Sequence, residues 1–371
     1  MARPNSTTKL RSLIPIWKSY CFKKLTNDVI LRNFYHINIY RSYSKTHIMR
    51  IAVIGGAGYI GSHVVKALLK QQHEIVVYDN LSTGHKENIF PNTKFIEGDI
   101  LNKEKLSESL KGCDAIVHLA ASKAAGESMT NPEKYSTNNI TGTINILNAA
   151  SENKIKYIVF SSSAAVYGNP EYLPVDEKHP TKPINYYGFT KLEIERILKW
   201  YDKLLGIKFA ALRYFNAVGY DIDGEIKGLE INPANLLPIV MEVAVGQREQ
   251  LQIFGDDYDT PDGTCIRDYI HVTDLANAHL KALEYIMKGK SLTVNLASES
   301  GLSVMDVVKC ARKVTGKPIP TVVVGRREGD PAKLAASSVK AHEILGWKAE
   351  YSDPETVLKT TWDVYKDHFF S

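Results

Sequence analysis

Gly55-Gly56-Ala57-Gly58-Tyr59-Ile60-Gly61 joins an apolar segment, residues 50–55, to a helical pattern at residues 60–71. The apolar segment predicts a strand. Glycines in such a turn let the backbone approach a pyrophosphate, and the start of the helix offers N–H donors and a positive dipole. Any tight turn can use glycine, so the pattern alone says little. Its position between a strand and a helix, however, is the context that a dinucleotide site requires.

Asp79 ends the next predicted strand, residues 74–79, about 20 residues after the glycines. A carboxylate at this position accepts hydrogen bonds from the adenosine ribose and would repel a 2′-phosphate. The sequence therefore favours NAD over NADP as the cofactor. The alternative role for Asp79 is a cap on a helix or turn, which we consider less favoured beside the glycines.

Strands and helices continue to alternate up to residue 216. Strands are predicted at residues 94–98, 114–119, 157–161 and 208–213, and helices at residues 138–153 and 187–205. This alternation indicates an α/β fold with a doubly wound parallel sheet, the Rossmann arrangement.

Beyond residue 216, glycine, proline and aspartate interrupt the pattern. Helices are expected near residues 233–245, 272–287, 303–314 and 354–369. We predict an NAD-binding domain at residues 49–216 and a smaller mixed α/β substrate domain at residues 217–371. The second domain should cover the carboxyl ends of the strands, where ligands of such sheets bind, and some of its segments should return to the sheet.

The chain has 371 residues, and its 44% apolar and 23% charged content excludes a wholly disordered or collagen-like protein. Its net charge of +5 is unevenly distributed, because residues 1–48 hold nine basic side chains and one acidic one. That segment is +8 and the remaining residues are −3, so we expect no nucleic-acid partner. No apolar run is long enough to span a bilayer, so we expect no membrane partner.

Residues 1–48 are rich in Arg, Lys and Ser and poor in acids, which is typical of an organelle transit peptide. Met49, however, stands directly before the first predicted strand. We interpret the segment as a disordered extension or an upstream start, with import as the alternative. Four widely separated cysteines favour reduced thiols and a cytoplasmic location.

Tyr187 and Lys191 lie four residues apart on the helix predicted at residues 187–205, so they share one face. An ammonium group stabilises a phenolate and lowers its pKa from about 10, which would let Tyr187 take a proton from a substrate hydroxyl. Ser163 follows a predicted strand and could hydrogen-bond the reacting oxygen. The alternatives are an exposed helix pair for Tyr187 and Lys191, and a turn cap for Ser163.

The glycine turn, Ser-Ser-Ser…Val-Tyr-Gly at residues 161–168 and Tyr-x-x-x-Lys at residues 187–191 together resemble the extended short-chain dehydrogenase/reductase family. Longer stretches narrow the resemblance to its UDP-glucose 4-epimerases. They are AASKAAGES ending at Ser128, LRYFNAVG at residues 212–219, FGDDYDTPDGTCIRDYIHVTDL at residues 254–275 and RREGD at residues 326–330. The resemblance runs from about Met49 to near the C-terminus.

This resemblance implies a role for three groups of residues. Tyr187 would be the catalytic base, Lys191 its partner, and Ser163 a helper at the 4-hydroxyl. The NAD site would comprise Gly55, Gly58, Tyr59, Ile60, Gly61, Asp79, Asn80, Leu81, Ser82, Thr83, Gly84, Asp99, Ile100, Leu119, Ala120, Ala121, Lys123, Asn138 and Phe215. The UDP-sugar site would comprise Ser163, Tyr187, Asn216, Asn235, Leu236, Gln252, Ile253, Phe254, Arg267, Arg327 and Asp330.

The two arginines agree with this assignment, since guanidinium groups suit a diphosphate. Without the resemblance, each would more commonly be a surface salt-bridge partner.

The implied activity is a reversible C4 epimerisation of UDP-glucose and UDP-galactose in galactose metabolism. Hydride would pass transiently to bound NAD, giving a 4-keto sugar. A homodimer is implied as well. The eleven histidines show no metal-ligand spacing, so we expect no metal.

Three alternatives stay open. They are an epimerase for UDP-GlcNAc, an epimerase for a UDP-uronate, and a non-catalytic NAD-sensing regulator. Leu334 aligns near a position whose bulk gates N-acetylated sugars in this family, and leucine is intermediate in size. A sugar dehydratase is disfavoured, because Ala164 and Ala165 occupy the place where that enzyme needs an acidic pair.

Overall fold

The computed structural model describes residues 48–230, 233, 235–327 and 331–370. Residues 49–371 form one compact unit. The expected N-terminal extension therefore lies almost entirely outside the described residues.

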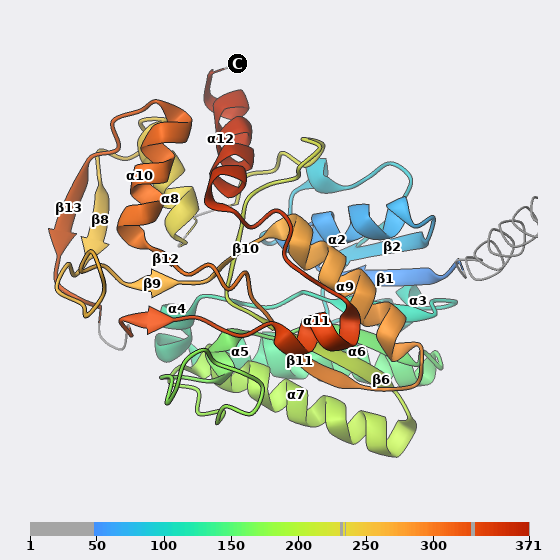
Figure 1. Cartoon of the computed structure of the whole chain (residues 1–371). Helices are drawn as coiled ribbons and strands as arrows, with labels where there is room; N and C mark the ends of the chain where they lie inside the picture. The colour runs from blue at the N-terminus through green and yellow to red at the C-terminus, as the bar shows by residue number, and fades with distance from the viewer. Residues whose placement is uncertain (1–47, 231–232, 234, 328–330, 371) are drawn as a thin grey trace, which may run out of the picture. The chain divides into compact units, whose positions relative to one another are not determined.

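A seven-stranded parallel sheet forms the centre of this unit (Figure 1). From one edge to the other, its strands are β3 (Lys94–Glu97), β2 (Glu74–Asp79), β1 (Arg50–Ile54), β4 (Ala115–His118), β5 (Tyr157–Ser161), β6 (Lys208–Tyr214) and β11 (Leu292–Leu296). The chain builds outward from β1 in one direction and then from β4 in the other, so a crevice opens at the carboxyl ends of these two strands. This confirms the predicted doubly wound fold.

Helices cover both faces of the sheet, because successive strand residues point to opposite sides. Ile51 and Val53 pack with one group of helices, and Ala52 and Ile54 pack with the other. The first group is α2 (Tyr59–Lys70), α9 (Val272–Ile286) and α11 (Val339–Leu345), and the second is α3 (Lys103–Ser109), α6 (Gly142–Glu152) and α7 (Tyr186–Leu205). Burial on both faces explains why the strands read as continuous apolar runs.

The helix that carries Tyr187 and Lys191 has well-defined ends. The side chain of Asn185 accepts a hydrogen bond from the Gly188 N–H at its start, and Gly206 ends it with a φ of 68°. A residue at this left-handed φ is usually glycine, which carries no Cβ to clash. The helix predicted at residues 187–205 is confirmed to within one residue.

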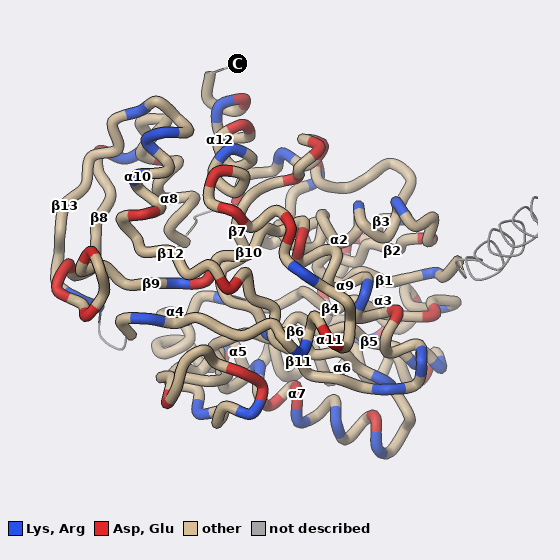
Figure 2. The backbone as a smooth tube through the Cα atoms, viewed as in Figure 1, with Lys and Arg blue, Asp and Glu red and all other residues tan. Residues whose placement is uncertain are grey.

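The second half of the chain forms a separate apolar cluster around α8 (Leu236–Ala244), α10 (Val304–Thr315) and α12 (Pro354–Phe370). Short strands surround it. They are β7 (Asn216–Val218) with β10 (Tyr269–His271), β8 (Leu251–Phe254) with β13 (Thr321–Val324), and β9 (Ile266–Arg267) with β12 (Leu302–Ser303) and β14 (Lys333–Leu334). Acidic residues gather on the loop between β8 and β9 (Figure 2). Strand β11 also comes from this half of the chain, and the domain boundary at residue 216 stays a prediction.

Smaller helical segments complete the first half of the chain. They are η1 (Lys86–Asn88), α4 (Ala125–Thr130), α5 (Pro132–Tyr135), the π-helical segment η2 (Ser136–Thr141) and η3 (Ala164–Val166). None of the helices in the described part of the chain combines the length and apolar character that crossing a membrane requires.

Candidate active site

A cavity of about 590 Å³ opens at the carboxyl ends of the central strands. It brings together the three predicted catalytic residues, most of the predicted cofactor residues and four of the predicted substrate residues, of which Ser163 and Tyr187 are also catalytic candidates. These are Ser163, Tyr187, Lys191, Gly55, Gly58, Tyr59, Ile60, Gly61, Asp79, Asn80, Ser82, Thr83, Ile100, Leu119, Ala120, Ala121, Lys123, Asn138, Phe215, Asn216 and Asn235.

The glycine turn lines one side of this cavity, and two of its glycines have no room for a side chain. Gly55 has a φ of 86°, and a Cβ there would lie 2.7 Å from the Ala120 backbone nitrogen. A Cβ on Gly61 would lie 2.0 Å from the Gly55 carbonyl oxygen. Gly58 is the N-cap of α2 and has no side chain to cap it, so the first N–H groups of the helix are available to an anionic ligand.

Asp79 connects the glycine turn to the end of β2. Its Oδ2 accepts a hydrogen bond from the Ala57 N–H at 3.0 Å, and its Oδ1 accepts one from the Leu81 N–H at 2.8 Å. Burial raises the pKa of this carboxyl group, and the two hydrogen bonds oppose the rise. The capping role that we considered less favoured is thus present, and the same carboxylate lines the cavity. Its contact with a ribose stays a prediction.

The catalytic candidates occupy the carboxyl end of β5 and the facing side of α7. Ser163 hydrogen-bonds the buried phenol of Tyr187. The Lys191 ammonium donates to the Ser161 carbonyl oxygen at 2.7 Å and lies 5.8 Å from the centre of the Tyr187 ring. The exposed helix pair is therefore wrong for Tyr187 and Lys191, since both side chains face the cavity. The capping alternative for Ser163 is present in part, because its Oγ accepts from the Ala165 N–H.

The electrostatics of this pair differ from our expectation. Burial raises the pKa of Tyr187, and its hydrogen bond with Ser163 only partly opposes the rise. Burial also lowers the pKa of Lys191 to about 7, with the Glu195 carboxylate acting in the opposite direction. The expected lowering of the Tyr187 pKa by Lys191 is therefore not found, because desolvation by burial is the largest cause of both shifts.

The remaining predicted residues do not line the cavity. Leu81, Gly84 and Asp99 lie beside its cofactor side, where Asp99 accepts a hydrogen bond from the Asn80 side chain at 2.9 Å. Leu236 begins α8, and Gln252, Ile253 and Phe254 belong to β8. The Arg267 guanidinium donates to the Pro331 carbonyl oxygen at 2.8 Å, and that of Arg327 lies 3.7 Å from the centre of the Phe254 ring. Asp330 lies outside the described residues.

Ten residues that line the cavity were not predicted from the sequence, although several of them lie within the motifs that carry the family resemblance. Ser161, Ser162, Tyr214, Ala217, Ser122, Ala124 and Glu127 belong to those stretches, and Tyr78, Gly98 and Lys134 complete the set. Glu127 accepts from Lys134 at 2.7 Å and from the Tyr135 hydroxyl at 3.0 Å. Position within a quoted motif was the available signal for seven of them.

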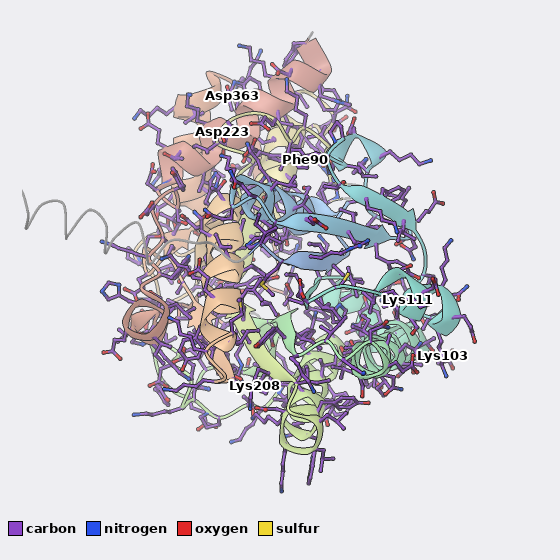
Figure 3. The ribbon with its side chains drawn as sticks, turned by 90° about the vertical axis from the view of Figure 1, so that its right-hand side faces the viewer. Phe90, Lys103, Lys111, Lys208, Asp223 and Asp363 are labelled. Carbon is purple, nitrogen blue, oxygen red and sulfur yellow. The ribbon has the colours of Figure 1, made fainter. Side chains whose placement is uncertain are left out.

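A separate acidic cluster lies on the loop after β7. Oxygens of Asp221, Asp223 and Glu225 lie within 4.8 Å of one another, and the Lys66 ammonium approaches them at 2.6, 2.9 and 3.2 Å, respectively. Burial lowers the pKa of Lys66, but the three carboxylates outweigh it and the net shift is upward. Asp223, labelled in Figure 3, does not line the cavity. The cluster therefore has a cation of its own.

Comparisons with known proteins agree with this geometry. A model of the NAD dependent epimerase/dehydratase family matches residues 51–297. The chain belongs to this family. A UDP-glucose 4-epimerase of Streptococcus mutans is 49% identical over 319 residues, which cover 85% of this chain and 96% of the relative.

Solved structures of the family are similar as well. A UDP-glucose 4-epimerase from Brucella ovis, in complex with NAD, has a TM-score of 0.83 and 44% identity, covering 85% of this chain and 98% of that one. One from Bifidobacterium longum, in complex with NAD⁺ and UDP, has a TM-score of 0.80 and 36% identity, covering 86% and 98%, respectively. The resemblance to this group of epimerases and the prediction of NAD as cofactor are confirmed.

Proposed function

We propose that the protein interconverts UDP-glucose and UDP-galactose by inverting C4 of the sugar. One observation carries this proposal. Ser163, Tyr187 and Lys191 meet at the end of β5, in the same cavity as the glycine turn and Asp79. A relative with 49% identity over most of the chain is a UDP-glucose 4-epimerase, which supports this substrate pair.

The cofactor side of the cavity suits NAD. The uncapped start of α2 would face the pyrophosphate, and Asp79 would face the adenosine ribose. When bound, NAD would supply a reversible hydride acceptor for C4 of the sugar.

The chain itself supplies the proton chemistry. Tyr187 acts in its phenolate form, which takes the proton of the sugar 4-hydroxyl and later gives it back, and Ser163 holds the same oxygen by a hydrogen bond. Lys191 in its protonated form would support the phenolate of Tyr187. Because burial has already lowered the pKa of Lys191 to about 7, this support should be sensitive to pH near neutrality.

The second half of the chain would hold UDP. Arg267 and Arg327 are suited to the diphosphate, and β8 would contact the uridine side. We propose that residues 49–216 bind NAD and residues 217–371 bind UDP. The 4-keto sugar must turn over between the two hydride transfers, so few contacts should hold the hexose itself.

A deuterium label at C4 of UDP-galactose tests this proposal. The full-length protein should form UDP-glucose that retains the deuterium at C4, because the hydride leaves and returns within one site. Failure to form UDP-glucose, with NAD supplied, would overturn the substrate assignment. Formation of UDP-glucose with loss of the label to water would overturn the hydride mechanism.

A second candidate substrate is UDP-GlcNAc. Leu334 pairs in register with Arg267 and packs beside a small apolar cluster that includes Val166 and Tyr167. Leucine is smaller than an aromatic residue, so this position could leave room for an N-acetyl group. Turnover of UDP-GlcNAc by the full-length wild-type protein and by Leu334→Tyr tests whether this position admits the N-acetyl group.

We also propose a homodimer formed through α7. Phe189, Trp200 and Leu204 fall on one face of this helix and are exposed, at 39%, 57% and 68% of their surface, respectively. An apolar stripe of this kind is typical of a helix that packs against a partner. Replacement of Trp200 and Leu204 by glutamate should halve the mass measured by light scattering.

We place the protein in the cytoplasm and in galactose metabolism, again as proposals. The Cys113 thiol is buried, and this burial raises its pKa to about 11, which suits a thiol that stays reduced.

A further inference from the structure

Three consecutive serines at the end of β5 each bond to α7. Ser163 bonds to Tyr187, the Ser161 carbonyl oxygen to Lys191, and the Ser162 hydroxyl to Glu195 at 2.5 Å. The three partners on α7 recur every four residues, so they form one stripe along the helix. The first two bonds belong to the proposed catalytic machinery. The third involves a carboxylate one helical turn beyond Lys191 that does not line the cavity.

Glu195 is deeply buried, with 1% of its surface exposed. Besides the Ser162 hydroxyl, its carboxylate accepts from Arg213 Nε at 2.8 Å and from Arg213 Nη2 at 2.5 Å. Arg213 lies on β6, and the Ser162 N–H donates to the Leu212 carbonyl oxygen on the same strand. The Ser162–Glu195–Arg213 cluster thus joins β5, β6 and α7 directly beneath the catalytic residues.

A buried ion pair is a poor way to gain stability, because desolvating two charges offsets their attraction. Apolar side chains of similar size would hold α7 on the sheet at least as well. Apolar side chains, however, do not fix how far a helix slides along its axis or rotates about it. A charged group with three directional hydrogen bonds fixes both. Within the part of the chain that the structure describes, the Ser162 hydroxyl is the only group that hydrogen-bonds the Glu195 carboxylate from the strand end that carries Ser163.

We propose that Ser162 and Glu195 are positioning residues for the epimerisation. Their hydrogen bond sets α7 against the end of β5, so that the Tyr187 hydroxyl and the Lys191 ammonium meet the oxygen held by Ser163. This inference rests on the proposed function. A displacement of about 1 Å in such a site can cost up to about 100-fold in rate, so the bond is expected to act on kcat.

The same cluster contains a matched control. Arg213 Nη1 donates to the Tyr167 hydroxyl at 2.9 Å, and this hydroxyl donates to Asn295 on β11 at 2.6 Å. Tyr167 lies on the far side of Arg213 and does not line the cavity. Tyr167→Phe therefore removes a buried hydroxyl that is hydrogen-bonded to the same ion pair, while leaving the link between β5 and α7 intact.

The test compares Ser162→Ala and Tyr167→Phe with the wild-type holoenzyme. For each protein we measure kcat and KM for UDP-galactose. Calorimetry gives the stoichiometry and Kd of UDP binding, and thermal unfolding gives the midpoint temperature. Both variants should lose thermal stability, because each removes a buried hydrogen bond. Ser162→Ala should lower kcat by about 10- to 100-fold while binding UDP at full stoichiometry and unchanged Kd. Tyr167→Phe should keep kcat within about two-fold.

A merely structural role would lower activity only in proportion to the fraction of protein that still binds UDP. A loss of activity of this proportional kind would overturn the inference. So would a kcat of Ser162→Ala within about two-fold of wild type, or a loss of kcat in Tyr167→Phe equal to that in Ser162→Ala. Ser162→Cys nearly preserves the side-chain volume with a weaker donor, so it should give an intermediate kcat even if Ser162→Ala folds poorly. A wild-type protein without turnover would instead overturn the proposed function and this inference with it.

Discussion

The two walls of the candidate site are built in different ways. On the wall formed by β5 and α7, Ser163, Tyr187 and Lys191 are bonded to one another or to the strand end, and Lys191 is buried. The second half of the chain reaches the cavity through Asn235 and forms the proposed UDP-binding wall, in which Arg267 and Arg327 belong to a two-residue strand and a loop beyond the residues that line the cavity. Arg327 lies over the Phe254 ring instead.

This difference matches the demands of the proposed reaction. Proton and hydride transfer need groups fixed to a fraction of an ångström, which cross-bonded buried elements provide. A diphosphate can be held by long arginine side chains that adjust to it, while the sugar turns over. Substitutions on the first wall should therefore lower kcat, and those on the second should raise KM.

Tyr187→Phe is expected to have the largest effect. Removal of the proton acceptor should lower kcat for UDP-galactose by about 10²- to 10⁴-fold, because positioned acid–base groups contribute this much. Steady-state kinetics with NAD-loaded protein measures the loss. A kcat within ten-fold of wild type would show that another group takes the proton.

Lys191→Met should come next, with a loss of kcat of about 10²-fold and a second signature in stability. Burial lowers the folded-state pKa of Lys191 to about 7, while the unfolded chain keeps the proton up to about 10.5. The unfolded state therefore binds more protons in this window, and wild-type stability rises with pH from about 7 to about 10. Urea unfolding of Lys191→Met should show a flatter pH dependence, and parallel curves would contradict the lowered pKa.

Arg267→Ala and Arg327→Ala test the second wall. Each should raise KM for UDP-galactose by about 10-fold and change kcat by less than about three-fold, as expected for one charge-assisted hydrogen bond to phosphate. Arg326→Ala is the matched control, because Arg326 already pairs with Asp257 at 2.7 Å on the exposed loop. If Arg326→Ala and Arg327→Ala raised KM equally, Arg327 would no longer be assigned as a ligand of the diphosphate.

Replacement of His271, which lies outside both walls, should have the smallest effect, and this effect should be on stability. Its Nδ1 accepts from the Thr273 N–H at the start of α9, and burial lowers its pKa to about 3. As pH falls from about 6.5 towards 3, His271 becomes protonated in the unfolded chain but stays neutral in the folded protein. The free energy of unfolding therefore decreases. His271→Asn keeps a capping acceptor, and its unfolding midpoint should fall less steeply between pH 6.5 and 4 while kcat at pH 7 is unchanged. An identical slope would contradict the lowered pKa.

The sequence predicted the first wall better than the second for a physical reason. The glycine turn, Asp79, Ser163 and the Tyr187–Lys191 pair depend on spacing within one strand end or one helix, which is visible in the chain. The Glu195–Arg213 pair depends on the packing of α7 against β6, which no local pattern reports.

The second wall depends on very short strands. Strands β9, β12 and β14 have two residues each, too few to show an alternating pattern. Their pairing, which brings Leu334 beside Arg267, is a tertiary outcome. The helix expected from residue 233 begins at Leu236 because Asn235 takes the N-cap position, a boundary that composition does not fix.

The most direct test measures kcat and the Kd of UDP side by side for wild type, Tyr187→Phe and Arg267→Ala. We predict a crossed result, in which Tyr187→Phe loses kcat and keeps its UDP affinity, while Arg267→Ala loses UDP affinity and keeps kcat. A Tyr187→Phe protein that no longer binds UDP, or an Arg267→Ala protein that binds UDP normally but does not turn over, would contradict the division of labour between the two walls.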